Sequence, residues 1–358
     1  MRNDGGKLTR NRVQVAMKRE FPEKKMNNIE GICKIFIQEH IILATPFGDG
    51  HVNDTFRVET EDGSGYVCQR IRKAMDIAAL EHNYLLYAQA FEAAGWPYPV
   101  WLRTKDGNRF FTDQEGDHWR MYPMIEGEVL ALPLSENALF SCGQGLARMH
   151  LILQALPGTP RAVYPMLHDL KHYYDRFCGL FENGTFDEEQ RDMELEEEIH
   201  SRLEEMLSLT LDKTRLIHGD PKLANILFQE GKVKAFIDLD TVMQGSLLED
   251  LADCIRSCCA KDGKMDQTLA QSLLRGYRSM AGDLLSEKEM ELLPKVIRKI
   301  CFELGLRYYT DSIAEKKSFR EKYPGYLREK AQGEVKDLFG NQVIHYQFPY
   351  AGFFCGLK

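Results

Sequence analysis

The sequence predicts an α+β protein with two lobes, a small lobe built on an antiparallel sheet and a larger, mainly helical lobe. Segments rich in β-branched and aromatic residues follow one another between residues 41 and 123. Helical periods dominate after residue 126, and short strand-like segments over residues 215–240 interrupt them. The expected division of the chain is a flexible leader over residues 1–30, a nucleotide-binding lobe over 31–125 and a catalytic lobe over 126–358.

Turn-forming residues separate the strands expected in the small lobe. Gly48-Asp49-Gly50 follows the first strand, and a hairpin turn over residues 61–65 follows the second. One helix interrupts the sheet, because Asp76 can cap it and apolar residues recur behind Asp76 at helical spacing. The expected strands lie over residues 41–46, 55–59, 66–71, 100–103, 109–112 and 118–122.

Apolar residues at helical spacing indicate the helices of the larger lobe. These helices are expected over residues 136–153, 166–181, 187–207, 247–260, 266–281 and 287–312. The strand-like segments among them cover residues 216–217, 226–228 and 233–237 and are joined by polar turns. Two lobes of this kind commonly bind a ligand in the cleft between them.

The composition excludes several classes of protein. The 358 residues contain 46 Lys and Arg against 54 Asp and Glu, a net charge of −8, which argues against a protein that grips a nucleic-acid backbone. No apolar run is long enough to span a bilayer, and residues 1–25 lack the apolar stretch of a secretory signal. Nine scattered cysteines without a Cys-x-x-Cys pair are typical of a reduced, cytoplasmic protein. We expect a monomer or weak homodimer that binds small molecules, and neither nucleic acid nor membrane.

The residues that carry chemistry concentrate in one loop and in two carboxylates behind it. Phosphoryl transfer from ATP needs a carboxylate that aligns the acceptor, ligands for Mg²⁺ and a positive charge near the γ-phosphate. Asp220, Lys222 and Asn225 supply these three groups within a few residues. Asp238 and Asp240 follow an apolar strand two residues apart, so in extended chain they face the same side and suit a shared Mg²⁺.

In this loop and in five other segments the sequence resembles the kinase-like superfamily of small-molecule phosphotransferases, which includes choline kinases and aminoglycoside phosphotransferases. It is most similar to N-acetylhexosamine 1-kinases, through Gly-His-Val-Asn-Asp-Thr, Asp-Leu-Asp-Thr-Val-Met and Arg-Tyr-Tyr-Thr-Asp. The matching segments run in the family's order over residues 48–56, 66–71, 119–127, 218–225, 237–243 and 303–311. The resemblance implies the two-lobed, protein kinase-like fold, with ATP and Mg²⁺ as cofactors.

The resemblance also implies a role for each polar residue of the loop and its neighbours. Asp220 is the expected catalytic base, which orients and deprotonates the acceptor hydroxyl, and Lys222 faces the transferring phosphate. Asn225 and Asp238 are the expected ligands of Mg²⁺, with Asp240 as a second carboxylate that could join them.

A second group of residues is implied in nucleotide binding. Arg70 occupies the position of the strand cation that pairs with the α- and β-phosphates, and Glu81 on the following helix would hold that cation. A register shift of one residue places Gln69 there instead. The glycine loop and the backbone of the hinge that meets adenine contribute Gly48, Gly50, Met121, Pro123, Met124 and Ile125. Asp250 is expected to brace the 218–225 loop.

The implied acceptor is an N-acetylhexosamine, GlcNAc or GalNAc, phosphorylated on its anomeric hydroxyl to the sugar 1-phosphate. Its expected contacts are His51, Asn53, Asp220, Arg307 and Asp311. Arg307 and Asp311 are four residues apart and therefore share one helix face. Another acceptor, such as an aminoglycoside, a choline-like amine or another sugar, is the alternative. A non-catalytic nucleotide-binding scaffold ranks lower, because Asp220, Asn225 and Asp238 are all present.

Other polar or reactive residues have simpler interpretations. His218 is expected to be a buried structural histidine that hydrogen-bonds the backbone. His168 and His172, four apart in a predicted helix, could share a metal, but a zinc site needs a third ligand and none is in view. The cysteines of the predicted helix over residues 247–260 are expected in the core. A protein kinase is disfavoured, because neither Asp-Phe-Gly nor Ala-Pro-Glu follows the loop.

Overall fold

The computed structural model describes residues 28–48, 53–261, 264–319 and 321–337, so the predictions for residues 1–27, Gly50 and His51 lie outside it. The chain forms two compact units: one contains the residues up to Ile71 together with Trp101–Pro123, and the other contains Arg72–Val100 and the residues from Met124 onward. The expected lobe boundary at residue 125 differs from this division in Arg72–Val100, which group with the helical unit. Within the described ranges, no helix is both long enough and apolar enough to cross a membrane.

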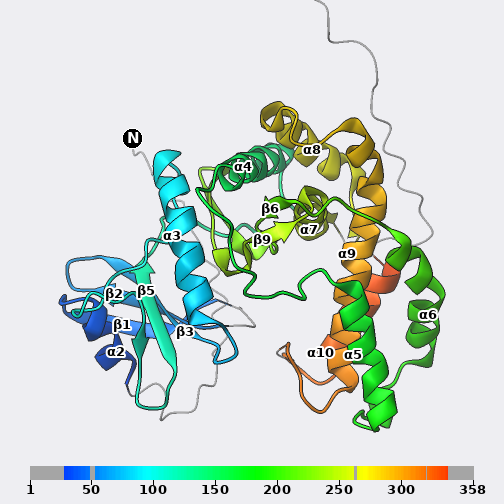
Figure 1. Ribbon diagram of the computed structural model, residues 1–358, viewed down its shortest axis with the longest axis horizontal. Coiled ribbons are helices and arrows are strands. Elements are labelled where there is room, and N and C mark those ends of the chain that lie inside the picture. Colours follow the sequence, from blue (N-terminus) through cyan, green and yellow to red (C-terminus); the bar gives the residue numbers. More distant parts are fainter. Residues whose placement is uncertain (1–27, 49–52, 262–263, 320, 338–358) are drawn as a thin grey trace, which may run out of the picture. The chain divides into compact units, whose positions relative to one another are not determined.

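An antiparallel sheet with the strand order β1-β2-β3-β5-β4 forms the first unit (Figure 1). Its strands are β1 (Ile41–Pro46), β2 (Asp54–Thr60), β3 (Gly65–Ile71), β4 (Phe111–Thr112) and β5 (His118–Pro123). The strand expected over residues 100–103 does not form. That stretch instead joins the sheet through the Leu102 N–H, which donates to the Met121 carbonyl at 2.8 Å.

A helix, α2 (Ile29–Phe36), begins inside the predicted leader and packs on this sheet. Ile29, Ile32 and Cys33 recur at helical spacing and are buried in one core with Phe56 and other residues of the strands. Burial of this apolar side stabilises the helix, although the polar sequence before it does not predict one. The leader prediction is therefore wrong for Ile29 and the residue that follows it.

Strand alternation places neighbouring residues of β3 on opposite faces of the sheet. Cys68 belongs to the core that also contains Phe56 and Met121, its partners on the two adjacent strands. Arg70, two residues further, therefore lies on the core face, whereas Gln69 lies on the opposite face. This difference decides which neighbours each side chain meets.

Helices dominate the second unit (Figure 1). They are α3 (Ile77–Ala93), α4 (Glu136–Gln154), α5 (Leu170–Asn183), α6 (Met193–Ser208), α7 (Leu247–Cys258), α8 (Gln267–Ala281), α9 (Glu287–Ile313) and α10 (Tyr326–Gln332). The predicted island of strands forms two antiparallel pairs, β6 (Arg215–Ile217) with β9 (Met243–Gly245) and β7 (Ile226–Gln229) with β8 (Lys232–Phe236). The 218–225 loop connects these two pairs.

Local capping corrects the predicted starts of two helices. Asp169 accepts from the His172 N–H at 3.0 Å and caps α5, so His168 lies outside the helix with a φ of 58°. His168 and His172 therefore do not share a helix face. Asp187 and Asp192 cap separate segments, a short 3-10 turn and then α6, which begins later than expected.

Two glycines allow α4 and α8 to approach backbone to backbone. A Cβ on Gly143 would collide with the Leu273 carbonyl, and a Cβ on Gly276 would collide with the Phe140 carbonyl. No side chain larger than hydrogen fits at either position. This approach lies on the same helices as His150 of α4 and Tyr277 of α8, which support the functional site.

Candidate active site

Asp250 on α7 holds the start of the 218–225 loop. The N–H of His218 donates to Asp250 Oδ2 at 2.7 Å, and the N–H of Gly219 donates to Asp250 Oδ1 at 2.8 Å. Asp250 is completely buried, and burial alone would raise its pKa. Contact with His150 and the loop N–H groups outweighs burial and lowers the pKa, so Asp250 is a carboxylate that accepts these bonds. This is the bracing contact that the resemblance implies.

His218 turns its ring toward the backbone, as its structural interpretation predicts. The side chain is buried, and Nε2 lies 3.0 Å from the Ile237 carbonyl at the end of β8. The N–H of Asp220 donates to His218 Nδ1 at 3.2 Å. His218 therefore ties the 218–225 loop to the segment that leads into Asp238.

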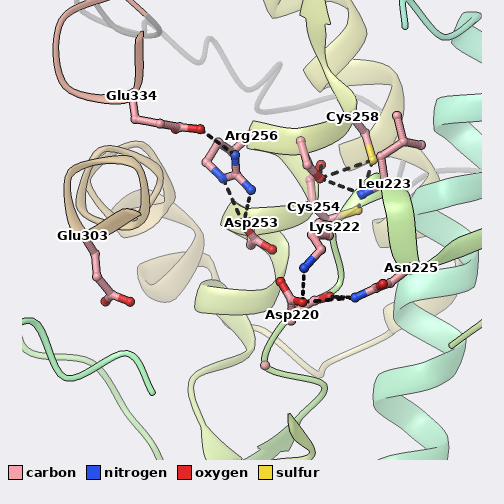
Figure 2. Close-up of polar contacts among 12 residues, drawn as sticks. Asp220, Lys222, Leu223, Asn225, Asp253, Cys254, Arg256, Cys258, Glu303 and Glu334 are labelled. Carbon is pink, nitrogen blue, oxygen red and sulfur yellow. Dashed lines mark hydrogen bonds and ion pairs between the residues drawn. The ribbon is translucent and has the colours of Figure 1, made fainter. Parts of the chain in front are cut away.

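Asp220, Lys222 and Asn225 lie in direct contact (Figure 2). Lys222 Nζ pairs with Asp220 Oδ2, and Asn225 Nδ2 donates to the same oxygen at 3.1 Å and to the Asp220 carbonyl at 2.9 Å. The side chains of Asp220 and Lys222 remain 30% and 38% exposed, so both can reach a ligand. The structure thus brings together three residues that the sequence singles out.

The charge balance around Lys222 is negative. Burial works to lower the pKa of the Lys222 ammonium, but the carboxylates of Asp220, Asp238 and Asp253 outweigh that effect and raise the pKa. Lys222 therefore keeps its proton at neutral pH. Arg256 also pairs with Asp253, so three carboxylates face two cations and one negative charge is left over for a further cation.

Asp238 lies beside the loop in an unusual conformation. The Ile237 N–H donates to the Asn225 carbonyl at 2.9 Å, which brings the end of β8 next to Asn225. Asp238 has φ 65° and ψ 54°, a left-handed conformation that a non-glycine residue adopts at an energetic cost and that is common at functional sites. The prediction that Asp238 and Asp240 share a side of an extended strand is wrong, because β8 ends at Phe236 and Asp240 lies buried in a 3-10 turn.

The donor chemistry fits a hard divalent cation. In the part of the chain that the structure describes, no three His, Cys, Asp or Glu side chains gather as a metal site. The predicted set differs, because it includes the amide of Asn225. Asn225 gives its nitrogen to Asp220, so its amide oxygen is the atom that remains for a ligand. Mg²⁺ prefers oxygen ligands, and a protein commonly supplies only one or two carboxylates beside water and phosphate oxygens.

In the first unit, Arg70 and Gln69, the two candidates for the strand position that faces the phosphates, have different partners. Arg70 donates from Nε to Asp54 and from Nη1 to Asp117, each at 2.9 Å. Gln69 on the opposite face accepts from Arg120 Nε at 2.9 Å, and the Arg120 guanidinium lies 4.7 Å from the centre of the Trp101 ring. The sheet therefore presents a different arginine on each face.

The other predicted nucleotide contacts are distributed over both units. Gly48 has a φ of 74°, the left-handed conformation that favours glycine, and Asn53 is buried. Glu81 lies half-buried on α3 of the second unit. Met121 is completely buried in the sheet core, and its carbonyl accepts from Leu102. The hinge residues with more accessible surface are Pro123, Met124 and Ile125.

Arg307 and Asp311 lie on α9, but they have different partners. Asp311 is completely buried; its Oδ1 accepts from Arg176 at 2.5 Å, and its Oδ2 accepts from the N–H groups of Ser318 and Phe319 at 2.5 and 2.6 Å. Asp311 thus holds the chain after α9 in place. Arg307 is 26% exposed and lies over the Tyr173 ring at 4.7 Å, so it is the residue of this pair that a ligand can reach.

The sequence does not predict a role at this site for three charged residues, Asp253, His168 and Glu303. Asp253 follows Asp250 by one turn of α7, which is the one sequence signal that could have found it. Glu303 and His168 form an ion pair at 3.3 Å, and no sequence pattern joins two residues so far apart in the chain. One carboxylate oxygen of Asp253 and one of Glu303 are buried without a hydrogen-bond partner among the described residues. Figure 2 shows Asp253 on the helix above Asp220, and Glu303 on a separate helix at the left.

Comparisons with known proteins agree with this chemistry. The model of the phosphotransferase enzyme family matches residues 44–282. A homoserine kinase of Agrobacterium fabrum is 26% identical over 60% of this chain and 64% of its own length, and one of Gluconobacter oxydans is 27% identical over 69% and 75%. The chain thus spans somewhat less than two thirds of the first of these relatives.

Solved structures share the fold at low sequence identity. An amicoumacin kinase in complex with AMP-PNP and Ca²⁺ superposes with a TM-score of 0.64 at 12% identity, over 90% of this chain and 96% of that one. A microcompartment-associated aminopropanol kinase gives a TM-score of 0.61 at 17% identity, over 87% and 95%. The predicted kinase-like α+β fold is therefore confirmed.

Proposed function

The chain belongs to the phosphotransferase enzyme family, and from that membership we propose that it transfers the γ-phosphate of ATP to a hydroxyl group of a small molecule, with Asp220 as the base. The observation that carries the proposal is the contact of Asp220 with both Lys222 and Asn225 in one accessible loop. This combination supplies a base, a cation and an amide oxygen within reach of one another.

In the proposed reaction, Asp220 aligns the acceptor hydroxyl and takes its proton as the oxygen bonds to the γ-phosphorus. The bond from that phosphorus to the β-phosphate oxygen breaks, and ADP leaves. Lys222, which stays protonated, neutralises charge on the transferred phosphoryl group. Asn225 and Asp238 would hold Mg²⁺, with Asp240 as a further carboxylate, and the ion would supply charge neutralisation for the phosphates.

The proposed nucleotide contacts are the strand cation, the hinge and the glycine turn. Arg70 pairs with the phosphates through the guanidinium N–H groups that do not donate to Asp54 or Asp117. Arg120 beside Gln69 is the alternative strand cation, since it lies on the other face of the sheet. Adenine meets the hinge backbone at Pro123, Met124 and Ile125, next to Met121, and the glycine turn that begins at Gly48 covers the phosphates.

For the acceptor we propose an N-acetylhexosamine phosphorylated at its anomeric carbon. The supporting features are the sequence segments around His51 and Asn53 and around Arg307, whose guanidinium is accessible. An anomeric hydroxyl is more acidic than other sugar hydroxyls, which suits a carboxylate base near neutral pH. Asp311 would act by positioning the chain after α9, since it is buried.

Homoserine is the second candidate acceptor, because the curated relatives carry the name homoserine kinase. It also offers a primary hydroxyl to the same base. An aminoglycoside, a choline-like amine or another sugar would use the same chemistry with different contacts.

A single screen separates these acceptors. The full chain is incubated with ATP and Mg²⁺ and with GlcNAc, GalNAc, homoserine, aminoglycosides, choline or other sugars, and ADP formation is measured. Phosphorus NMR of the product then identifies the hydroxyl that was modified. If none of these acceptors leads to ADP formation although ATP binds tightly, the proposal is contradicted and a nucleotide-binding scaffold is favoured.

A further inference from the structure

His168 contacts the 218–225 loop from a position that the proposed reaction does not use. Its Nε2 lies 3.0 Å from the Gly219 carbonyl oxygen, and its Nδ1 lies 3.3 Å from Glu303 Oε1 on α9. The His168 side chain is 7% exposed and that of Glu303 is 2% exposed. Gly219 directly precedes the proposed base, so this contact acts on the backbone next to Asp220.

The geometry requires a proton on Nε2 of the His168 ring. A carbonyl oxygen can only accept, so Nε2 must donate to Gly219. Burial alone would raise the pKa of Glu303, but its neighbours, among them Arg307 and Lys299, lower it, so Glu303 is ionised. Nδ1 lies at ion-pair distance from this carboxylate and makes no hydrogen bond among the described residues. A carboxylate next to Nδ1 favours a proton there as well. His168 is therefore an imidazolium.

The charged groups around His168 agree with that state. Burial works to lower the His168 pKa, but Glu303 first, and then Glu249 and Asp253 of α7, raise it to about 9. Lys213 donates to the His168 backbone carbonyl at 3.1 Å and pairs with Glu249 at 2.9 Å. His168 itself has a φ of 58°, a left-handed backbone conformation.

The loop before Asp220 is consequently held by charges of opposite sign. The N–H of Gly219 donates to the Asp250 carboxylate, while its carbonyl accepts from His168. Gly219 itself has a φ of 86°, and a Cβ there would lie 2.7 Å from the Thr241 carbonyl, so its backbone has no room to shift toward that segment. Loss of either charged partner would free one of the two peptide groups that flank the Gly219 Cα.

We propose that His168 is a positioning residue for phosphoryl transfer: held between Glu303 and the Gly219 carbonyl, its imidazolium fixes the backbone that presents Asp220 to the acceptor. The inference rests on the proposed function for its kinetic consequence, but the backbone contact stands independently of it. His168 touches neither substrate in this assignment. It acts through Gly219.

The test compares three variants. His168→Ala removes the donor and the charge, and His168→Gln keeps a donor without the charge. His172→Ala is the matched control, because His172 is exposed on α5. With the acceptor found by the screen, His168→Ala is expected to lower kcat at least tenfold while KM for ATP changes less than twofold. His168→Gln should recover part of that loss, and His172→Ala should match the wild type.

The pH profile provides a readout that a purely structural role would not change. The wild-type kcat is expected to fall as pH rises through about 9, where the imidazolium loses its proton. Glu303→Gln should move this fall to lower pH by at least one unit, and His168→Gln should abolish it. A fall that stays in place in both variants would overturn the proposal.

Hydrogen–deuterium exchange of residues 216–221, measured without substrates, tests the contact directly. We expect faster exchange in His168→Ala and unchanged exchange in His172→Ala. If the wild type transfers no phosphate, the proposed function fails, and exchange alone decides whether His168 holds the loop. Unchanged exchange and unchanged kcat in a folded His168→Ala protein would refute the inference. If that variant does not fold, His168→Gln and Glu303→Gln decide it by the pH profile and by exchange.

Discussion

His150 Nε2 lies 3.0 Å from Asp250 Oδ2, and both side chains are completely buried. Through this contact α4 fixes the carboxylate of α7 that accepts from the 218–225 loop. His150 Nδ1 lies 2.8 Å from the Tyr277 hydroxyl, so α8 joins the same network. The loop is thus supported by three helices, of which α4 lies far from α7 and α8 in the sequence.

Truncation of His150 should destabilise the protein strongly. His150→Ala removes the side-chain partner of the buried Asp250 carboxylate and leaves it only the two N–H groups of the loop, which costs about 3 kcal/mol or more. Tyr277→Phe removes only one hydroxyl from the same network and should cost about 1 kcal/mol. Urea denaturation at pH 7 measures both. Equal losses in the two variants would contradict this assignment of the network.

Replacement of the proposed base should abolish turnover and preserve nucleotide binding. Asp220→Asn keeps the shape of the side chain but cannot take a proton, so kcat should fall by about 10²–10⁴-fold. Calorimetric titration with a nonhydrolysable ATP analogue should give a Kd within a few-fold of the wild type. Asp175→Asn, an exposed residue of α5, is the control. Full activity of Asp220→Asn would refute the mechanism.

Two arginines of the sheet allow the strand cation to be identified. Arg70→Ala should raise KM for ATP about tenfold or more, since a charge-assisted contact to phosphate contributes on the order of 1.5–3 kcal/mol. Arg120→Ala should have the smaller effect on KM for ATP, because the Arg120 guanidinium donates to Gln69 and lies over the Trp101 ring. The opposite ranking would assign the phosphate contact to the Gln69 face of the sheet.

The close approach of α4 and α8 predicts a specific glycine effect. Gly276→Ala places a methyl group against the Phe140 carbonyl and should destabilise by about 1–3 kcal/mol. Gly179→Ala on α5 is the matched control, since the nearest atom to its Cβ is the Asn183 side chain at 3.9 Å. That substitution should be neutral or stabilising by up to about 1 kcal/mol, because alanine favours a helix. Thermal unfolding distinguishes the two variants.

Glu196 should contribute stability that disappears in acid. Burial works to raise its pKa, but Arg191 and the Tyr309 hydroxyl outweigh it and lower the pKa. Stability from this carboxylate is therefore present above its unfolded pKa and is lost as pH falls through the lower, folded value. Glu196→Gln should cost about 1–3 kcal/mol at pH 7 and much less at pH 3, by urea denaturation.

Glu197→Gln is the control for this measurement, because Glu197 is exposed on the same helix. It should change stability by less than about 0.5 kcal/mol at either pH. A Glu196→Gln effect of equal size at pH 7 and pH 3 would show that packing, and not charge, causes the loss.

Local sequence patterns predict the strands of the sheet and the loop that contains Asp220, Lys222 and Asn225. The three side chains meet because they are only a few residues apart, so the turn itself brings them together. The helix at Ile29 and the missing strand at residues 100–103 are errors of the same local reasoning. There the outcome depends on contacts with the sheet, which spacing along the chain does not reveal.

By itself, then, the sequence determined the class of fold and the chemical groups available for phosphoryl transfer. Only the tertiary structure decided the partners of the charged residues: Asp311 with Arg176, His168 with Glu303, and Arg70 with Asp54 and Asp117. The physical reason is that the pairing and pKa of a charge depend on its burial and on neighbours from other elements. Those neighbours are set by packing across the chain and not by spacing within a segment.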